Sequence, residues 1–344
     1  MVVTATTGTI GQVQGSLRPM DPTRDLGAIA DLIEEAFAHE IDERGRAAIR
    51  EMRWMDRLAP LVWWWSQADP AFQDTFNGFV WEEPTQSDSG TQIVGNVSLN
   101  RTPGSYQHRI VCNVVVQEGY RGQGIGRRLT EAAVAEARAS GAEGVVLQVH
   151  RDNPRALQLY TDLGFWQAAG ETDLQLSAVG PVNPAAARGY CLQAWQPTQG
   201  QNVYELARLV TPAPLQWIRP VRADSYKLGW WTRLGQQVAH AVKRQRVYRL
   251  VALKEERLVA MMTVTAALQQ GAHHLEILVH PEHRGQVESA LVSRALHILS
   301  AVPSKPVRAT VFADHNAAQT ALHDNGFEEV RTLLTLRKDL DRRG

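Results

Sequence analysis

The sequence predicts an α/β (α+β) fold made of two related domains, each with a mixed central sheet flanked by helices. The chain has 344 residues, more than a single hydrophobic core usually organises. Apolar runs with a period of two residues alternate with runs of 3.6-residue period, as layered α/β domains require. Short motifs also recur in the same order at similar spacing, which indicates two copies of one unit.

The internal repeat consists of three matched motifs. Pro22-Thr23 recurs as Pro197-Thr198 after 175 positions. Arg121-Gly122-Gln123 recurs as Arg284-Gly285-Gln286 after 163 positions, and Gly164-Phe165 recurs as Gly326-Phe327 after 162. These offsets predict four segments: a flexible lead-in at 1–15, a first domain at 16–180, a linker at 181–187 and a second domain at 188–340.

Each element of the first domain follows from its pattern of apolar and turn residues. Thr102-Pro103-Gly104-Ser105 separates two strand patterns, as in a hairpin, and Gly141 follows an amphipathic helix, where a left-handed cap is common. Paired prolines and a glycine in 180–184 predict the linker. The expected order is strand 16–19, helices across 24–67, strands 76–82, 92–100 and 108–116, helix 124–140, strand 144–149, helix 153–163 and closing strands in 165–179.

The composition is that of a soluble globular protein. Hydrophobic residues make up 44% of the chain and charged residues 21%, and 36 basic residues balance 36 acidic ones. The overall charge therefore gives no support to a nucleic-acid or membrane partner. Cys112 and Cys191 have no metal-ligand spacing, so we expect a reducing compartment and no metal. The N-terminal residues contain no secretion signal or membrane span, which predicts a cytoplasmic protein. Both a monomer and a homodimer remain open.

The most informative stretch is 113–137, where an apolar strand leads through a glycine-rich turn into an amphipathic helix. Gly122, Gly124 and Gly126 allow a tight turn whose N–H groups approach a ligand, and the helix directs its positive end to the same point. Arg121 and Arg127 can donate to phosphate oxygens, although a solvated basic turn would have the same sequence. The stretch lacks the Gly-Lys-Ser/Thr ending of a P-loop and the third glycine of a dinucleotide fingerprint.

Two motifs together resemble the GNAT superfamily of N-acetyltransferases. R-x-x-G-x-G, from Arg121 to Gly126, resembles the superfamily's acetyl-CoA signature. N-x-x-A-x-x-L-Y-x-x-x-G-F, from Asn153 to Phe165, matches the superfamily downstream of the next strand. Members bind acetyl-CoA where the fourth and fifth strands part, and they transfer the acetyl group directly to an amine. The resemblance therefore implies two tandem GNAT-type domains with acetyl-CoA as co-substrate.

The resemblance also implies roles for individual residues. Backbone groups of 114–116 would pair with the pantetheine arm and stabilise an oxyanion. Tyr160 would be the general acid, unless it is simply a buried structural tyrosine. His108 is the candidate general base, although a lone histidine is more often structural, and Glu118, Glu82 and Glu83 are weaker candidates. The expected coenzyme-binding residues are Val114, Val115, Val116, Arg121, Gly122, Gln123, Gly124, Ile125, Gly126, Arg127, Asn153, Ala156 and Tyr160.

The second copy has lost the site but kept the scaffold pattern. Its turn has the sequence RGQVES, so Val287 and Ser289 replace Gly124 and Gly126, and Glu288 adds a negative charge. Leu322 stands at the position of Tyr160, and His315 at that of Asn153. A valine disfavours glycine-only backbone angles, so we expect no coenzyme there. The arrangement resembles tandem members such as mycothiol synthase, but no motif identifies that substrate.

The leading hypothesis is an N-acetyltransferase that acts on a primary amine of a small molecule. Direct transfer is expected because no activated cysteine or serine nucleophile is evident. Two alternatives remain open: a non-catalytic acyl-CoA sensor, and an acetyltransferase of protein N-termini or lysines. Five tryptophans could line an acceptor pocket or anchor the core: Trp54, Trp63, Trp64, Trp65 and Trp81.

Overall fold

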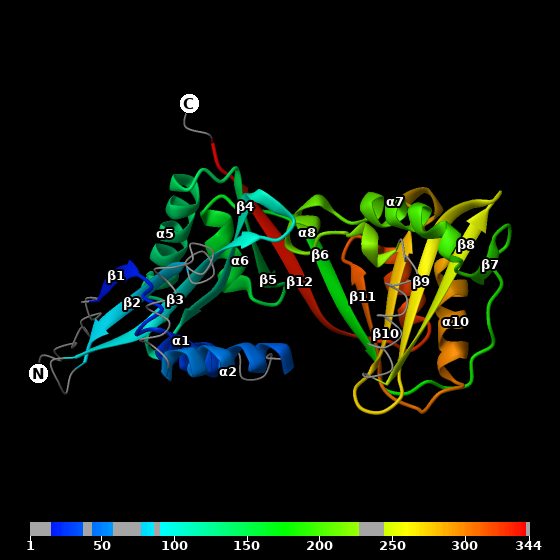
Figure 1. Ribbon diagram of the computed structural model, residues 1–344, viewed down its shortest axis with the longest axis horizontal. Helices are drawn as coiled ribbons and strands as arrows, with labels where there is room; N and C mark the ends of the chain where they lie inside the picture. The colour runs from blue at the N-terminus through cyan, green and yellow to red at the C-terminus, as the bar shows by residue number, and fades with distance from the viewer. Residues whose placement is uncertain (1–14, 37–42, 58–76, 86–89, 227–243, 342–344) are drawn as a thin grey trace, which may run out of the picture. The chain divides into compact units, whose positions relative to one another are not determined.

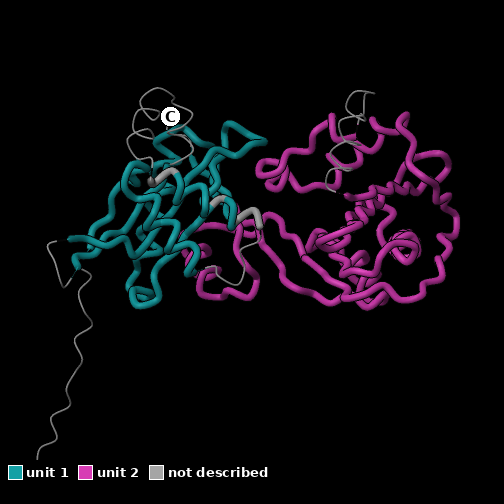
Figure 2. The backbone as a smooth tube through the Cα atoms, turned by 60° about the horizontal axis from the view of Figure 1, so that its bottom comes forward, with its two compact units in different colours: residues 1–147, 338–344 teal, residues 148–337 magenta. Residues whose placement is uncertain are grey.

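A computed structural model describes residues 15–36, 43–57, 77–85, 90–226 and 244–341. The chain divides into two compact units, shown in Figure 2. Unit 1 contains residues 1–147 together with 338–344, and unit 2 contains residues 148–337. Each unit is described separately below.

Unit 1 is a mixed sheet with helices on both faces (Figure 1). Its strand order is β1-β2-β3-β4-β5, in which all neighbours are antiparallel except the parallel pair β4 and β5. The elements are β1 (Ser16–Pro19), α1 (Leu26–Ala36), α2 (Glu43–Arg57), β2 (Gly78–Pro84), β3 (Thr91–Thr102), β4 (Ser105–Val116), the 3₁₀ turn η1 (Glu118–Tyr120), α5 (Ile125–Ala139) and β5 (Gly144–His150), whose last three residues belong to unit 2.

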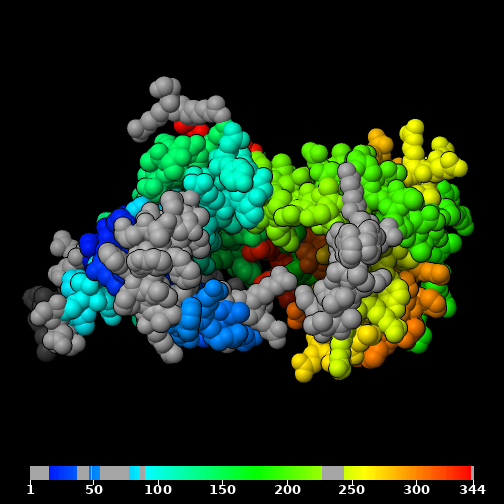
Figure 3. Space-filling view, in the orientation of Figure 1, coloured from blue at the N-terminus to red at the C-terminus, as the bar shows by residue number. Residues whose placement is uncertain are grey.

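Helices α1 and α5 cover opposite faces of this sheet. Successive residues of a strand point to opposite faces. Val80 packs in a cluster with α1 and α2, whereas the ring of the next residue, Trp81, lies 5.3 Å from the guanidinium carbon of Arg128 on α5. Trp81 is therefore a core residue, while Trp54 is 59% exposed. Trp54 belongs to α2, the helix whose residues are blue in Figure 3. The other three tryptophans considered for an acceptor pocket lie outside the described residues.

Unit 2 has the strand order β12-β6-β11-β10-β9-β8-β7, with β10 and β11 as its parallel pair. Its core includes Leu174 of β6, Leu291 of α10 and Phe327. The elements are α6 (Pro154–Asp162), β6 (Trp166–Leu176), β7 (Cys191–Ala194), η2 (Pro197–Gln199), α7 (Gly200–Val210), α8 (Ala213–Ile218), η3 (Ala223–Ser225), β8 (Gln245–Lys254), β9 (Arg257–Ala267), β10 (His273–Val279), η4 (Pro281–His283), α10 (Glu288–Leu299), β11 (Val307–Phe312), α11 (Asn316–His323) and β12 (Glu328–Asp339).

The compact units differ from the two sequence repeats. Strand β6 ends the first repeat, yet it pairs antiparallel with β11 and with β12, both from the second repeat. At the other end of the chain, the N–H of Leu340 donates to the carbonyl of Glu143 at 2.9 Å within unit 1. The expected boundary near residue 180 therefore marks the end of a repeat, whereas the compact units exchange their closing segments.

The local turn predictions are confirmed. Thr102 and Ser105 pair across a two-residue hairpin, and Gly141 has a positive φ of 75° directly after the C-cap of α5. Residues 181–187 form neither helix nor strand, although the N–H of Ala185 donates to the Oγ of Ser293 at 2.9 Å. Within the described residues, no helix is both long and apolar enough to cross a membrane.

Candidate functional site

The paired register of β4 and β5 ends before β4 does. The two strands pair from His108 opposite Gly144 to Val111 opposite Leu147, while β4 continues to Val116. β5 also continues, to His150, so the two strands stop pairing before either one ends, and the backbone groups at the end of β4 do not pair with β5. A strand edge of this kind can pair with an extended ligand, which agrees with the role predicted for Val114, Val115 and Val116.

A β-bulge interrupts β4 within this segment. Asn113 has a φ of +52°, and the register against β3 shifts between the pairs Asn96–Val115 and Ser98–Cys112. The Nδ2 of Asn96 donates to the carbonyl of Asn113 at 3.1 Å, which supports the bulge from the neighbouring strand. Bulges often occur next to active sites, where they redirect backbone groups.

The glycine-rich turn after β4 has the geometry expected of an anion cradle. Gly122 and Gly124 have φ values of +80° and +81°, and a Cβ added at either residue would meet nothing within 4 Å. Gly124 is the N-cap of α5 and provides no side-chain bond to the first-turn N–H groups, which have no partners inside the helix. Ile125, 1% exposed, anchors this helix start in the core. An anion could therefore approach bare main chain at the positive end of α5.

The remaining predicted side chains of the turn are close to this cradle along the chain. The Nε of Arg121 donates to the carbonyl of Val116 at 2.9 Å, which holds the guanidinium beside the end of β4. The amide of Gln123 donates to the carbonyl of Gly119 at 3.4 Å. Gly126 and Arg127 follow in the first turn of α5, where the Oγ1 of Thr130 donates to the Gly126 carbonyl at 2.8 Å.

Three other predicted residues lie together at the start and along one side of α6, in unit 2. The side chain of Asn153 caps this helix by accepting from the N–H of Ala156 at 3.1 Å. One turn later, Tyr160 is 6% exposed and makes an edge-on contact with Phe165, with ring centroids 5.9 Å apart. Burial raises the pKa of Tyr160 to about 12, so the phenol remains protonated at neutral pH.

His108 lies away from the cradle. It is buried near the start of β4, and its Nδ1 is 2.8 Å from the Oγ of Ser105. Val114 lies six positions further along the chain, a distance of roughly 20 Å along an extended strand. The structure therefore does not bring His108 together with the bulge or the glycine turn.

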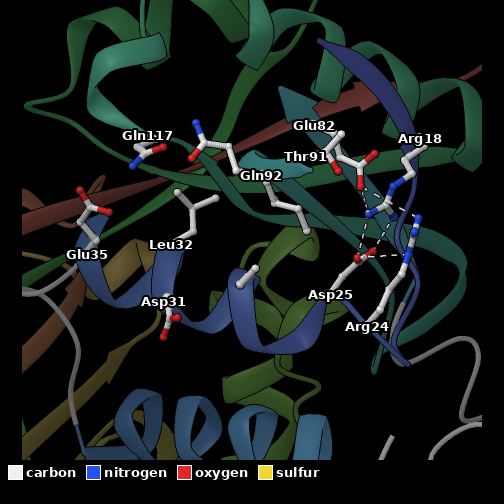
Figure 4. Close-up of a pocket in the computed structure, with 12 residues that line it drawn as sticks. Arg18, Arg24, Asp25, Asp31, Leu32, Glu35, Glu82, Thr91, Gln92 and Gln117 are labelled. Carbon is white, nitrogen blue, oxygen red and sulfur yellow. Dashed lines mark hydrogen bonds and ion pairs between the residues drawn. The ribbon is translucent and has the colours of Figure 1, made fainter. Parts of the chain in front are cut away.

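A pocket of about 430 Å³ lies between α1 and the ends of β1, β2 and β3 (Figure 4). The guanidinium of Arg18 binds both carboxylate oxygens of Asp25, at 2.6 and 2.8 Å, and also contacts Glu82. The bond from Arg18 lowers the pKa of Glu82, which makes Glu82 a poor general base. Four carboxylates and two guanidiniums line the pocket: Asp25, Asp31, Glu35, Glu82, Arg18 and Arg24.

The pocket and the glycine turn adjoin at the same end of β4. Gln117, which follows β4 directly, lines the pocket, and so does Gln92 of β3. The amide of Gln92 donates to the hydroxyl of Tyr120 at 2.8 Å, and Tyr120 immediately precedes Arg121. One wall of the acidic pocket therefore contacts the segment that begins the cradle.

Neither cysteine has the environment of an activated nucleophile. Burial raises the pKa of the Cys112 thiol to about 11, so it is a thiol at neutral pH. Cys191 is exposed on β7 in unit 2. The state of Cys112 agrees with a mechanism in which no covalent acyl-cysteine forms.

In the second copy, the side chain of Glu288 binds the main-chain N–H groups of the turn. Gly285 retains a φ of +84°, but Val287 has φ −123° and ψ −16°, where Gly124 has φ +81° and ψ 0°. The Glu288 carboxylate accepts from the N–H of Gly285 at 2.9 and 3.0 Å and from that of Val287 at 3.1 Å. The Nε2 of His315 lies 2.8 Å from this carboxylate, and both side chains are 2% exposed.

The hydrogen bonds determine the ionisation of Glu288. Burial by itself would raise the pKa of its carboxyl group. The bonds from His315 and from the backbone N–H groups outweigh burial, so the pKa is below its ordinary value. An ionised carboxylate therefore occupies the place where the first copy leaves main-chain donors open.

Two residues of the site were missed in the sequence. Asn113 forms the bulge in β4, and Asn96 is fully buried with an Oδ1 that accepts no hydrogen bond from the described residues. The available signal was an asparagine directly before a valine in each strand, Asn96 before Val97 in β3 and Asn113 before Val114 in β4. Only the strand register reveals that these two asparagines meet.

Comparison with known proteins agrees with this geometry. Residues 33–165 match the family model described as Acetyltransferase (GNAT) family. The chain is 30% identical over 167 residues to a mycothiol acetyltransferase of Amycolatopsis mediterranei (strain U-32), a match covering 46% of this chain and 48% of that protein. It is 27% identical over 161 residues to a mycothiol acetyltransferase of Renibacterium salmoninarum, covering 44% and 41%. The matched segments thus span about half the length of these relatives.

A solved structure shares the fold across both copies. The GCN5-related N-acetyltransferase from Sphaerobacter thermophilus superimposes with a TM-score of 0.57 and 16% identity, covering 94% of this chain and 95% of that one. Residues 33–165 therefore resemble the acetyltransferase (GNAT) family, and the whole chain shares the fold of a solved GCN5-related N-acetyltransferase.

Proposed function

We propose that this protein is an N-acetyltransferase that transfers an acetyl group from acetyl-CoA directly to a primary amine of a small molecule. The observation that supports this most is the bare cradle, in which Gly122 and Gly124 have left-handed backbone angles at the uncapped start of α5. A doubly charged pyrophosphate fits such a site because main-chain N–H groups and the helix dipole both favour an anion. The relatives named mycothiol acetyltransferase support a small acceptor.

In this proposal the chain binds and orients its co-substrate through backbone groups. The end of β4, from Val114 to Val116, pairs with the pantetheine arm, and Arg121 and Arg127 contact phosphate oxygens. Asn153 and Ala156 hold the start of α6. Tyr160, whose phenol is protonated at neutral pH, donates its proton to the leaving sulfur. Acetyl-CoA supplies the activated acetyl thioester.

We further propose that each chain binds one coenzyme. The ionised Glu288 occupies the donors of the second turn, and Val287 has lost the left-handed angles of Gly124. A pyrophosphate there would meet a buried negative charge. Calorimetry with acetyl-CoA is expected to give one site per chain, and a stoichiometry of two would contradict this part of the proposal.

The acidic pocket supports a cationic acceptor. Its lining has four carboxylates against two guanidiniums. Arg18 binds Asp25 and Glu82, and Arg53 of α2 binds Asp31 at 2.6 Å, so among the described residues Glu35 is the lining carboxylate available to an amine. Glu35 lines the pocket from the last turn of α1. Glu35→Gln is expected to lower kcat/KM for a cationic amine about fivefold, the effect of roughly 1 kcal/mol from an exposed charge. An equal loss for an uncharged amine would indicate that the charge of Glu35 is not what matters.

His108 remains the proposed general base, and its distance from the bulge makes a direct test necessary. If His108 acts as the base, His108→Gln lowers kcat most at low pH and alters the pH profile. If it only supports the Ser105 turn, the variant has a lower melting temperature and an unchanged pH profile. The second result would exclude His108 as the base.

Tyr160→Phe tests the catalytic proposal as a whole. The variant is expected to bind acetyl-CoA with unchanged Kd but to release CoA about 100-fold more slowly with a cognate amine, since a general acid contributes 10²–10⁴. Tyr226→Phe is the matched control, because Tyr226 is another tyrosine of unit 2 whose pKa is raised by burial. Unchanged turnover in Tyr160→Phe would remove the acid from the mechanism.

The cognate amine can be found by screening for CoA release. Amines, polyamines, amino acids, aminoglycosides and thiol-sugar amines cover the small-molecule classes. Peptide N-termini and lysine peptides test the alternative of a protein acetyltransferase. Tight acetyl-CoA binding without turnover on any of them would favour the acyl-CoA sensor instead. We also propose a cytoplasmic location, as a monomer or homodimer, without a nucleic-acid or membrane partner.

A further inference from the structure

The turn before the cradle of the second copy contains a cluster of possible metal ligands. His280 is the N-cap of the short turn η4, and Glu282 and His283 lie within that turn; one ligand atom from each lies within 4.8 Å of the other two. Aligning Arg284 with Arg121 places His280 opposite Gln117 and His283 opposite Tyr120. The first copy therefore has no imidazole at either position, and the cluster is particular to the second.

A chain of hydrogen bonds determines which nitrogen of His283 is available. The Nε2 of Gln286 donates to the carbonyl of Glu282 at 3.2 Å, which orients the amide. Its Oε1 accepts the hydroxyl proton of Tyr190 at 2.8 Å. A hydroxyl has only one proton, so the bond of 2.9 Å between Tyr190 and His283 requires Nδ1–H of His283 as donor. The Nε2 of His283 is then unprotonated and has a lone pair.

The other two groups provide a second nitrogen and an oxygen. The Nδ1 of His280 is unprotonated, because it accepts from the N–H of Glu282 at 3.4 Å; an ion would displace this long bond to use the lone pair. It lies 4.0 Å from the Oε2 of Glu282. The side chains of His280 and Glu282 are 32% and 82% exposed, so an ion can reach them from solution and Glu282 can rotate toward it.

We propose that this cluster binds one divalent transition-metal ion of the Zn²⁺ class. Two imidazole nitrogens and one carboxylate oxygen form a donor set that suits Zn²⁺ or Co²⁺, with water in the fourth position. Tyr190 is a positioning residue, because an outer hydrogen bond to the second ring nitrogen fixes the orientation of a ligating histidine. The positive group facing the site is Lys254, whose ammonium lies 5.5 Å from the centre of the Tyr190 ring.

The bound ion would stabilise the conformation of η4 next to Tyr190, the residue directly before β7. Tyr190 and His283 already meet edge-on, with ring centroids 5.7 Å apart, so the ion would add to an existing contact. A ligand that binds only the folded state stabilises it by mass action. Addition of Zn²⁺ is therefore expected to raise the melting temperature of the chain.

The test uses the full chain after treatment with a chelator and dialysis. Calorimetric titration with ZnCl₂, and with Co²⁺ followed by its visible absorption, is expected to show one ion per chain in tetrahedral coordination. His280→Gln copies the first copy's residue and is expected to weaken binding at least tenfold. Tyr190→Phe retains all three ligands and is expected to weaken it about tenfold, the usual effect of losing an outer partner.

Two further variants make the result decisive. Glu282→Gln removes a ligand from a mostly exposed side chain, so it should fold normally and still lose affinity. His297→Gln changes an exposed histidine of α10 outside the cluster and should bind as the unaltered chain does. The proposal is overturned if the unaltered chain binds no ion, or if His280→Gln and Glu282→Gln bind it with unchanged affinity.

Discussion

Gly124→Val gives the sharpest test of the cradle, because the second copy already contains valine at the equivalent position. Gly124 has φ +81° and ψ 0°, whereas Val287 has φ −123° and ψ −16°. An L-residue in the left-handed region costs about 1–2 kcal/mol. The variant must either accept this strain or rotate its backbone toward the conformation of the second copy.

The expected stability change is small and the expected affinity change is large. A cost of about 1–2 kcal/mol lowers the melting temperature by a few degrees for units of this size. Rotation of the turn would remove at least two main-chain bonds to a charged phosphate, each contributing about 1.5–3 kcal/mol. The loss is then at least about 3 kcal/mol, or more than 100-fold in Kd for acetyl-CoA.

Gly141→Val is the matched control for backbone strain. Gly141 also has a positive φ, of 75°, and open space around an added Cβ, but it follows the opposite end of α5. It should therefore lose similar stability and retain full affinity. Calorimetry with acetyl-CoA and thermal unfolding of both variants make the comparison. Unchanged affinity in Gly124→Val, or an equal loss in Gly141→Val, would refute the assignment of the cradle.

Two further predictions concern stability. Glu288→Gln is expected to destabilise the protein by about 3 kcal/mol, since it leaves a buried partner unpaired. The folded pKa of Glu288 lies below its ordinary value of 4.5, so the stability difference from the unaltered protein should shrink as pH falls through that folded value. Denaturant titrations that show a pH-independent difference would contradict this. Glu282→Gln, the same substitution at an exposed glutamate, is the control for losing a negative charge without losing a buried partner. Leu340→Ala should lower the free energy of unfolding by about 2–5 kcal/mol, because Leu340 is 4% exposed in unit 1. Leu209→Ala, at a 59% exposed position, is the control and should change the free energy of unfolding little in the same titration.

Much of the local structure was predictable because it depends on near neighbours. Asn153 caps α6, Gly141 ends α5, and Gly122 and Gly124 adopt angles that other residues avoid. Loss of Gly124 in the second copy likewise predicted a closed cradle. How the second cradle is closed was less evident. The negative charge of Glu288 was expected to oppose phosphate binding, and the structure shows that its carboxylate also binds the N–H groups of Gly285 and Val287.

The sequence by itself determined the repeat, the order of helices and strands, and the turn that can bind an anion, because these follow from periodicity and backbone preference along the chain. Only the tertiary structure decided which strands are neighbours. The placement of β6 between β11 and β12, the meeting of Asn96 with Asn113, and the burial of Glu288 against His315 all depend on contacts between distant segments. A strand's apolar pattern specifies that one face must be buried but not which partner buries it, so the exchange of closing strands leaves no local signal.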